Sequence, residues 1–567
     1  MIQRLLLCFF IVIVSVIYGF PNIILSLKLG ENYNPLPISG FSPIARDEAF
    51  AYAPEANFIL KGNLFLKEMY VKEYQNTPTP FLGETAPSLV YAVLSKLTGS
   101  IEKAFIAGDF IFPPIIFVLL YLVARIYINN NFFALSAAFL TVIARDFIAV
   151  IPYPHETFQY LNFEEGQNYL LYFSRAFHPQ LTFIFFSLAV LATVKMFQSP
   201  NKKFPIVLTG MLIGILFYSY IFYWTYFLFF SGLLVIYLIV SRNLFSTKRV
   251  VIAILIGLIL GLPYFYNMFQ FYKLDLASDF VAKTSLHNLR LPITLLRYLI
   301  ISAIFFLSYP KKDQKFYLFF SLLMSGILIA PISKLVIGQD LETFHYLRRA
   351  LMPFATIALF VSAYYLIKNK SPILKVLPVL IVAVVLYLGF KTQLIASNRI
   401  YLAHTRDYDR EAVFSWLRSN TVKDSTVGSL NTTFNSLLPL YTQNWTFFPP
   451  TDRTVTPTAE GVRRYITLSK MLGIGKNWQK KNLDNIISYL FVYQAYDNQN
   501  RLDLNSPKRI WAESEIDKYS ETNIAISDQL DYLVVTPEEL EIIKPDTNIL
   551  HPLTSINKYI IFRLRQS

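Results

Sequence analysis

Long apolar runs recur along this chain of 567 residues and limit its fold more than any other feature. Several approach the roughly 20 residues that an α-helix needs to cross about 30 Å of hydrocarbon. Hydrophobic residues make up 54% of the chain and charged residues 16%, against about 25% charged residues in soluble domains. The sequence therefore predicts an α-helical polytopic membrane protein.

Hydropathy predicts about eleven transmembrane helices. Their expected positions are residues 5–27, 106–127, 132–151, 178–197, 205–220, 222–240, 250–271, 291–308, 316–337, 346–367 and 374–391. If the N-terminus lies inside, as Arg4 indicates, the loops richest in lysine and arginine fall on the inner side. This placement explains most of the net charge of +14, so no nucleic-acid partner is needed to account for it.

This topology predicts a multi-pass protein of the plasma membrane, held in the lipid bilayer with a cytoplasmic N-terminus. Residues 1–391 form the expected transmembrane domain, in which residues 28–105 are a long first outer loop. Apolar side chains at helical spacing in residues 88–105 predict an interfacial helix in that loop. Residues 392–567 are expected to form an extracytoplasmic mixed α/β domain, with strands in "STVGSL", "DYLVVTP" and "KYIIFRLR".

An adjacent acidic pair, Asp47 and Glu48, follows the first apolar run in this loop. Consecutive side chains on a helix point about 100° apart, so the two carboxylates are expected to have different roles. One can act as a general base on an acceptor hydroxyl, while the other binds a metal, a sugar hydroxyl or Arg46. The alternative is electrostatic, because acids in a first helical turn interact favourably with the helix dipole. Glu55, in the same loop, is a further candidate for substrate binding.

The second outer loop, residues 152–177, and the span after it contain two histidines among charged residues. His155 and Glu156 are side chains that can bind a metal, but they lack the spacing of a zinc-protease motif. A divalent metal therefore stays open as a cofactor, and no other cofactor is indicated. Arg175 and His178 are three residues apart, which suits one helix face. Either snorkelling at the interface or recognition of a phosphate or acceptor explains them.

Two arginines stand where the tenth span begins, in residues 338–354. Helical spacing places His345 roughly on one face with Arg348 and Arg349. Arginines at an outer boundary need a reason, because basic residues concentrate on the inner side. A phosphate would supply one, since the planar guanidinium donates two parallel hydrogen bonds. Pairing with a nearby acid is the alternative.

An aromatic cluster, "YSYIFYWTYFLFF", lies between two predicted spans at residues 218–230. An aromatic belt at the membrane interface explains such a cluster. Stacking on a sugar or an isoprenoid is the functional alternative.

The order of these pieces resembles the GT-C superfamily of membrane glycosyltransferases, which includes protein O-mannosyltransferases and aminoarabinose transferases. The resemblance rests on Asp47-Glu48 after a first span, then "ANFILKGN", "TAPSLVYAVLSKLTGS" and the proline-containing second span "FIFPPIIFVLLYLVARIY". It covers about residues 1–200, and beyond them it rests on topology and an outer C-terminal domain. The chain departs from the family's "KPPL"-type stretch, because "TAPSLVY" has no lysine there.

The resemblance implies transfer of a sugar from a polyprenyl-phosphate-linked donor to an acceptor on the outer face of the membrane. It implies that Asp47 activates the acceptor and that Glu48 assists. It also implies outer arginines on the lipid phosphate. The residues themselves suggest Arg348 and Arg349 for this role, with Arg175 behind them. The sequence does not define the acceptor.

Two other functions are alternatives to this one. A transporter or flippase often has internal repeats and charged or broken helices at the membrane midplane. The predicted spans hold few central charges, and the sequence contains no evident repeat. A non-catalytic membrane protein that presents its C-terminal domain would not need acids and arginines to converge. The glycosyltransferase hypothesis accounts for the long first loop, the acidic pair and the outer arginines together.

Overall fold

The computed structural model describes residues 2–36, 48–144, 170–284, 294–337, 343–369, 371–495, 503, 505–520 and 530–565. The chain forms two compact units. The first, here the helical unit, comprises Met1–Glu48, Gly83–Tyr264 and Leu289–Thr405. The second, here the sheet unit, comprises Ala49–Leu82, Phe265–Asn288 and Arg406–Ser567. The sheet unit thus takes in two segments ahead of residue 392, and the domain boundary expected there stays a prediction.

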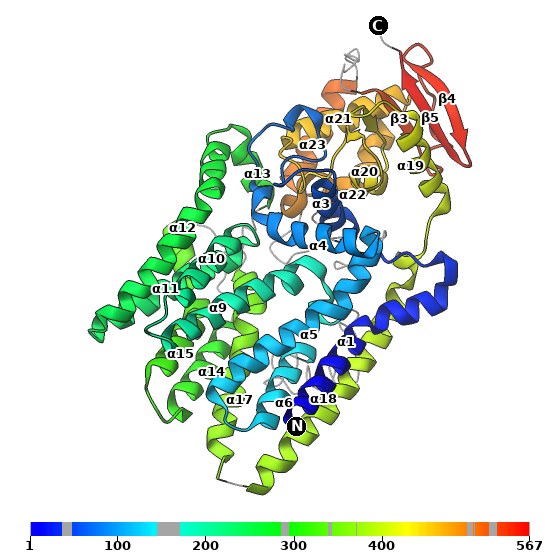
Figure 1. The fold of residues 1–567 in the computed structure, drawn as a ribbon. Helices are drawn as coiled ribbons and strands as arrows, with labels where there is room; N and C mark the ends of the chain where they lie inside the picture. Colours follow the sequence, from blue (N-terminus) through cyan, green and yellow to red (C-terminus); the bar gives the residue numbers. More distant parts are fainter. Residues whose placement is uncertain are drawn as a thin grey trace. The chain divides into compact units, whose positions relative to one another are not determined.

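The helical unit is a bundle of long apolar helices (Figure 1). Its helices are α1 (Ile2–Leu29), α4 (Thr85–Thr98), α5 (Ile101–Tyr127), α6 (Asn131–Ile143), α9 (Thr182–Gln198), α10 (Phe204–Phe217), α11 (Ile221–Val240), α12 (Leu244–Tyr272), α14 (Thr294–Ser308), α15 (Gln314–Ile337), α16 (Thr343–His345), α17 (Met352–Ile367) and α18 (Ser371–Ile400). The helix α5 packs against α1, α4, α6 and α9, so it lies at the centre of the first half of the bundle.

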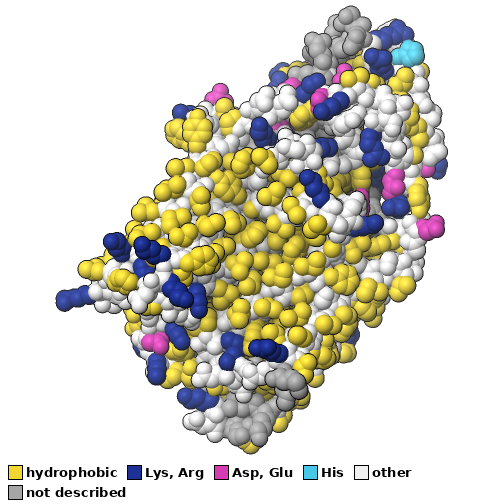
Figure 2. Space-filling model, in the orientation of Figure 1, with side chains coloured by type: hydrophobic (Ala, Val, Ile, Leu, Met, Phe, Trp, Pro, Cys, Tyr) yellow, Lys and Arg dark blue, Asp and Glu magenta, His cyan; other side chains and the backbone are white. Residues whose placement is uncertain are grey.

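Seven helices of the described chain are long and apolar enough to cross a membrane, and four shorter apolar helices accompany them. Each of the predicted spans corresponds to one of these helices. Hydrophobic side chains form a broad band over the helices, while lysines and arginines gather at one end of them (Figure 2). The prediction of a polytopic helical membrane protein is therefore confirmed.

The predicted interfacial helix over residues 88–105 is divided between two helices. The helix α4 ends at Gly99, whose φ of +87° suits a residue without a side chain. The helix α5 then starts after Ser100, whose side chain accepts a hydrogen bond from the Lys103 backbone amide. On α4 the side chains of Leu89, Val93 and Leu97 are 43%, 50% and 78% exposed, and they stand four residues apart on one face. An apolar exposed stripe of this kind suits a helix lying at a membrane surface.

The sheet unit contains helices around a five-stranded sheet. Its main helices are α3 (Ala53–Leu60), α13 (Leu276–Thr284), α19 (Tyr408–Asn420), α20 (Thr432–Tyr441), α21 (Thr458–Met471), α22 (Lys476–Phe491) and α23 (Pro507–Ser520). The strands are β1 (Thr426–Gly428), β2 (Trp445–Thr446), β3 (Tyr532–Val535), β4 (Leu550–Ile556) and β5 (Tyr559–Leu564), in the order β2-β1-β3-β5-β4. The strand β1 is parallel to β2 and β3, and β5 is antiparallel to β3 and β4. The predicted mixed α/β domain is confirmed.

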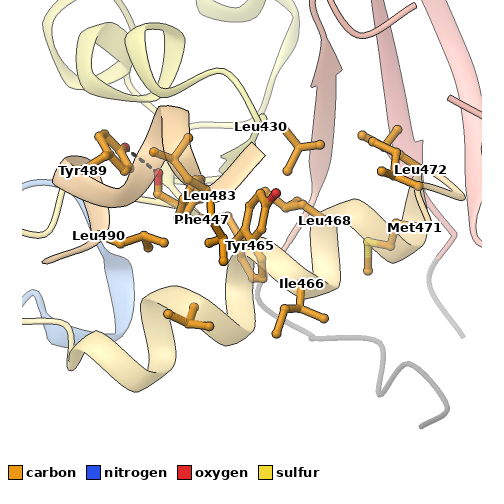
Figure 3. Packing of buried hydrophobic residues seen from close by; sticks show 14 of the residues in the cluster. Leu430, Phe447, Tyr465, Ile466, Leu468, Met471, Leu472, Leu483, Tyr489 and Leu490 are labelled. Carbon is orange, nitrogen blue, oxygen red and sulfur yellow. Dashed lines mark hydrogen bonds between the residues drawn. The ribbon is translucent and has the colours of Figure 1, made fainter. Parts of the chain in front are cut away.

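The core of the sheet unit lies between the sheet and the helices α21 and α22 (Figure 3). Phe447, Tyr465, Leu468 and Leu490 are among its buried side chains. Each fully buried side chain of this size contributes roughly 1.5–3 kcal/mol through removal of apolar surface from water. Close packing continues at Gly428 in β1, where a Cβ atom would meet Leu468 Cδ2 at 2.9 Å.

Candidate functional site

Tyr220 is the centre of a polar cluster in the helical unit. It lies at the turn between α10 and α11, where its extended backbone (φ −169°, ψ 125°) opens the helix α11. The imidazole ring of His178 stacks on its phenol ring, with 4.1 Å between ring centroids and 23° between ring planes. Tyr220 belongs to the aromatic run at residues 218–230, which an aromatic belt at the membrane interface would explain. In the structure its ring contacts a polar side chain, the His178 imidazole.

Two residues of the tenth predicted span contact the same tyrosine. The Tyr220 hydroxyl lies 3.1 Å from Nδ1 of His345, and Nη1 of Arg349 donates a hydrogen bond to that hydroxyl. The Arg349 guanidinium also lies over the Tyr220 ring, 5.3 Å from its centroid. The Tyr223 hydroxyl donates to the Arg349 carbonyl at 3.2 Å, which fixes the backbone at this point. Arg349 is 7% exposed, so its charge is held inside the protein.

His178 belongs to a short irregular helix, Ala176–Leu181, that precedes α9. The helical backbone is interrupted at His178 (φ −118°, ψ 104°), immediately before Pro179. Because of this interruption, Arg175 and His178 do not share a helix face, as their spacing had suggested. The charges of Arg175 and Arg349 both act on the His178 ring.

Two carboxylates adjoin this short helix. Oε1 of Glu84 lies 3.6 Å from Nε2 of His178. Oε1 of Glu48 accepts a hydrogen bond from the Ala176 amide at 3.3 Å. Glu84 is held against the bundle because the Ala86 amide donates to the Tyr218 carbonyl at 2.7 Å. The second residue of the acidic pair thus meets the segment that carries Arg175 and His178.

The predicted site residues are distributed over three places. His178, His345 and Arg349 contact Tyr220, while Glu48 and Arg175 adjoin the segment that carries His178. Arg348 is exposed, with its guanidinium 4.8 Å from the centroid of the Phe344 ring. Of the two adjacent arginines, Arg349 is therefore the buried one that contacts Tyr220.

Glu55 belongs to the sheet unit, where it lies in the first turn of the helix α3 and is 1% exposed. Nη1 of Arg453 lies 3.5 Å from its Oε1, so this carboxylate takes part in a buried ion pair. Asp47, His155 and Glu156 lie outside the described residues. Over the described ranges, no three His, Cys, Asp or Glu side chains come close enough together to hold a metal ion.

No sequence pattern singles out Glu84 or places Tyr220 at the centre of a site. Glu84 stands in a proline-rich connector, and Tyr220 is one of several aromatic residues in a row. Their contacts join positions far apart in the chain, such as Tyr220 and Arg349, so no local pattern reveals them. The arrangement offers cationic donors beside carboxylates, which suits an anionic substrate with a hydroxyl or sugar close to its charge.

Similarity to known proteins is found among solved structures. No protein-family model matches the chain, and no curated protein matches it. Among solved structures, ArnT from Cupriavidus metallidurans in the apo state matches over 96% of this chain and 97% of its own, with a TM-score of 0.48 and 11% identity. The Archaeoglobus fulgidus oligosaccharyltransferase in the apo form matches over 93% of this chain and 69% of its own, with a TM-score of 0.48 and 11% identity.

Both neighbours also match in other forms. ArnT bound to undecaprenyl phosphate gives a TM-score of 0.44. The oligosaccharyltransferase tethered to an acceptor peptide containing the NVT sequon gives 0.45. The resemblance to GT-C membrane glycosyltransferases stays a prediction, because each of these TM-scores lies below 0.5. With identities of 11–12% and TM-scores in this range, neither the donor nor the acceptor of this chain follows from the matches.

Proposed function

We propose that this chain is an integral membrane glycosyltransferase that transfers a sugar from a polyprenyl-phosphate-linked donor to an acceptor on the outer face of the membrane. One observation carries the proposal: the hydrogen bond from the Ala176 amide to Glu48. This hydrogen bond brings Glu48, the second residue of the acidic pair, to the short segment that carries Arg175 and His178. A carboxylate that can serve an acceptor and cations that can hold a phosphate then adjoin each other, as glycosyl transfer requires.

The proposed reaction uses each group in one role. An acceptor hydroxyl attacks the anomeric carbon of the donor, the bond from that carbon to the phosphate oxygen breaks, and polyprenyl phosphate leaves. Asp47 takes the proton of the hydroxyl as general base. Arg349 and Arg175 stabilise the charge that grows on the phosphate, because guanidinium groups donate several hydrogen bonds to phosphate oxygens. Glu48, the neighbour of Asp47 in the sequence, accepts a hydrogen bond from the segment that carries Arg175.

The test is a transfer assay with purified protein, radiolabelled polyprenyl-phosphate sugars and membranes as the source of acceptor, with and without a chelator of divalent metals. We expect label to move from the lipid to another molecule in the wild-type reaction. Asp47→Asn should abolish transfer while leaving expression and the melting temperature unchanged. An Asp47→Asn variant of full activity would remove this residue from the mechanism. A protein that moves labelled lipid across vesicles without breaking its sugar–phosphate bond would be a flippase instead.

A further inference from the structure

Asp109 is a carboxylate inside the apolar helix α5, one of the helices long enough to span the membrane. Ionisable residues in such helices are rare, and they face polar partners inside the bundle when they occur. Asp109 follows this pattern. Its Oδ2 accepts a hydrogen bond from Nδ2 of Asn22 at 2.8 Å, and its Oδ1 accepts one from Nε2 of Gln180 at 3.2 Å. Two side-chain amides from two other segments therefore donate to one carboxylate.

Gln180 connects Asp109 with the candidate site through further hydrogen bonds. It is fully buried, and its Oε1 accepts a hydrogen bond from the Tyr91 hydroxyl at 2.9 Å. Its Nε2 also donates to the Phe173 carbonyl at 2.8 Å, and its backbone amide donates to the Arg175 carbonyl at 3.1 Å. Gln180 thus clamps the turn between residues 173 and 180, which carries both Arg175 and His178.

The other end of the network approaches the acidic pair. Oδ1 of Asn22 accepts a hydrogen bond from the Tyr33 hydroxyl at 2.6 Å. Burial raises the pKa of Tyr33 well above its usual range, and the charges of Asp109 and Glu48 raise it further. Tyr33 therefore stays a neutral donor, and the charge of Glu48 is close enough to act on it. Since Glu48 also accepts from the Ala176 amide, the network adjoins the segment of Arg175 from two sides.

We infer that Asp109 is a positioning residue, which holds Arg175 and His178 at a fixed distance from Glu48 through its hydrogen bond to Gln180. The inference rests on the proposed function, because that function assigns Arg175 to the lipid phosphate. Asp109 itself contacts no substrate in this scheme. The side-chain amides of Asn22 and Gln180 both donate hydrogen bonds to Asp109, so position 109 needs the two acceptor oxygens of a carboxylate.

The test uses the exchange of a carboxylate between positions 109 and 180. Asp109→Asn keeps the size of the side chain but supplies one oxygen and one NH₂ group, so it can satisfy only one of the two donating amides. The double variant adds Gln180→Glu to Asp109→Asn, so the carboxylate now stands at position 180. The amide at position 109 then accepts from Asn22 and donates to the carboxylate at position 180. The Tyr91 hydroxyl still finds an oxygen there. In the double variant the Phe173 carbonyl loses its donor and faces a carboxylate oxygen, which repels it.

Two quantities are measured on the full chain: sugar transfer, and binding of polyprenyl phosphate by native mass spectrometry. We expect Asp109→Asn to lower kcat/KM roughly 10²-fold, as a small misplacement of binding groups does, and to weaken binding at least about tenfold. The double variant should recover part of both losses, because the contact between positions 109 and 180 is restored while the contact with the Phe173 carbonyl is not. Asp313→Asn is the matched control, since Asp313 caps α15 by accepting from the Phe316 amide, and an asparagine can accept in its place.

Each outcome has a distinct meaning. Wild-type kinetics and binding in Asp109→Asn would overturn the inference and leave the proposed function intact. Equal losses in the single and double variants, with lowered melting temperatures in both, would reduce Asp109 to a structural residue and also overturn it. A wild-type protein that neither binds polyprenyl phosphate nor transfers sugar would overturn the proposed function, and the inference with it.

Discussion

At the scale of single residues, the two adjacent arginines of the tenth predicted span have different environments. Arg349 is buried and bonded to Tyr220, whereas Arg348 is exposed over the ring of Phe344. From the sequence, both arginines are candidates for binding the lipid phosphate, because helical spacing puts each of them close to the helix face of His345. Only burial separates the two, and burial depends on neighbours such as Tyr220 that come from a distant helix.

This difference gives the first prediction. Arg349→Gln should reduce kcat/KM for the lipid-linked donor by roughly 10- to 100-fold, since one hydrogen bond to a charged group contributes about 1.5–3 kcal/mol. Arg348→Gln should have a smaller effect. The measurement is initial transfer rate against donor concentration, with the exposed Arg399→Gln as a control for loss of positive charge. If Arg348→Gln caused the larger loss, the phosphate would bind on the exposed face instead.

Lys283 gives a prediction about pH. It is fully buried in the sheet unit, and its Nζ donates to the Thr456 carbonyl at 2.8 Å. Burial lowers the pKa of Lys283 to about 8, although Asp279 and Glu68 nearby favour the charged form. The unfolded chain, with a lysine pKa near 10.4, therefore binds more protons than the folded chain between about pH 8 and pH 10.4. The contribution of Lys283 to the free energy of unfolding should rise with pH over this window.

Lys283→Met tests this sign, because it removes the titrating group and keeps much of the side-chain volume. The difference in the free energy of unfolding between wild type and Lys283→Met should shift in favour of the wild type by up to about 3 kcal/mol from pH 8 to pH 10.4. Chemical unfolding in detergent, followed by tryptophan fluorescence, measures it. A difference that stays constant over that window would show that Lys283 titrates normally.

At the scale of elements, a glycine controls how closely α4 approaches α5. A Cβ atom at Gly108 would lie 2.5 Å from the Tyr91 hydroxyl, which is the group that donates to Gln180. The close approach of two helices at a small residue is common in membrane bundles. Here it also sets the position of a hydrogen-bond donor, so packing and site geometry depend on the same residue.

Gly108→Ala should therefore lower transfer activity about tenfold or more, because the added methyl group displaces Tyr91 from Gln180. Stability should change less, since alanine favours the helix by about 1 kcal/mol over glycine and offsets part of the strain. Gly232→Ala is the matched control: Gly232 is also helical, and a Cβ there would meet nothing within 4 Å. Equal activity of the two variants would mean that the α4–α5 contact does not set the position of the site.

Elements also show where the sequence predicted the fold and where it could not. Spans such as α5 and α11 were predictable because an apolar run of membrane length has one main solution in lipid. The strands β1, β3 and β5 were found from their apolar patterns, but β2 has two residues and β4 contains Pro552, so neither gives a strand signal. The site was predictable only in part, because the roles of Tyr220, Glu84 and Asp109 arise from contacts between distant segments.

At the scale of the whole molecule, the charge asymmetry of the loops predicts the orientation in the membrane. The exposed basic residues of the predicted inner loops include Lys202, Lys203, Arg242, Lys248, Lys311 and Lys312. Many of the lysines and arginines visible in Figure 2 gather at one end of the apolar band. Basic loops of this kind stay on the cytoplasmic side of a membrane. The residues after α18 are therefore predicted to lie on the opposite side, because an odd number of expected spans precedes them.

The single cysteine of the chain makes this orientation directly testable. With Cys8 replaced by serine, a cysteine introduced at the exposed position Lys423 should react with a membrane-impermeant maleimide in intact cells. A cysteine at the exposed position Lys202 should react only after the membrane is permeabilised. The paired variants control for each other, since both replace an exposed lysine and differ only in the predicted side. The reverse labelling pattern would place the sheet unit in the cytoplasm, where a sugar acceptor on the outer face could not reach it, and the proposed function would have to change sides as well.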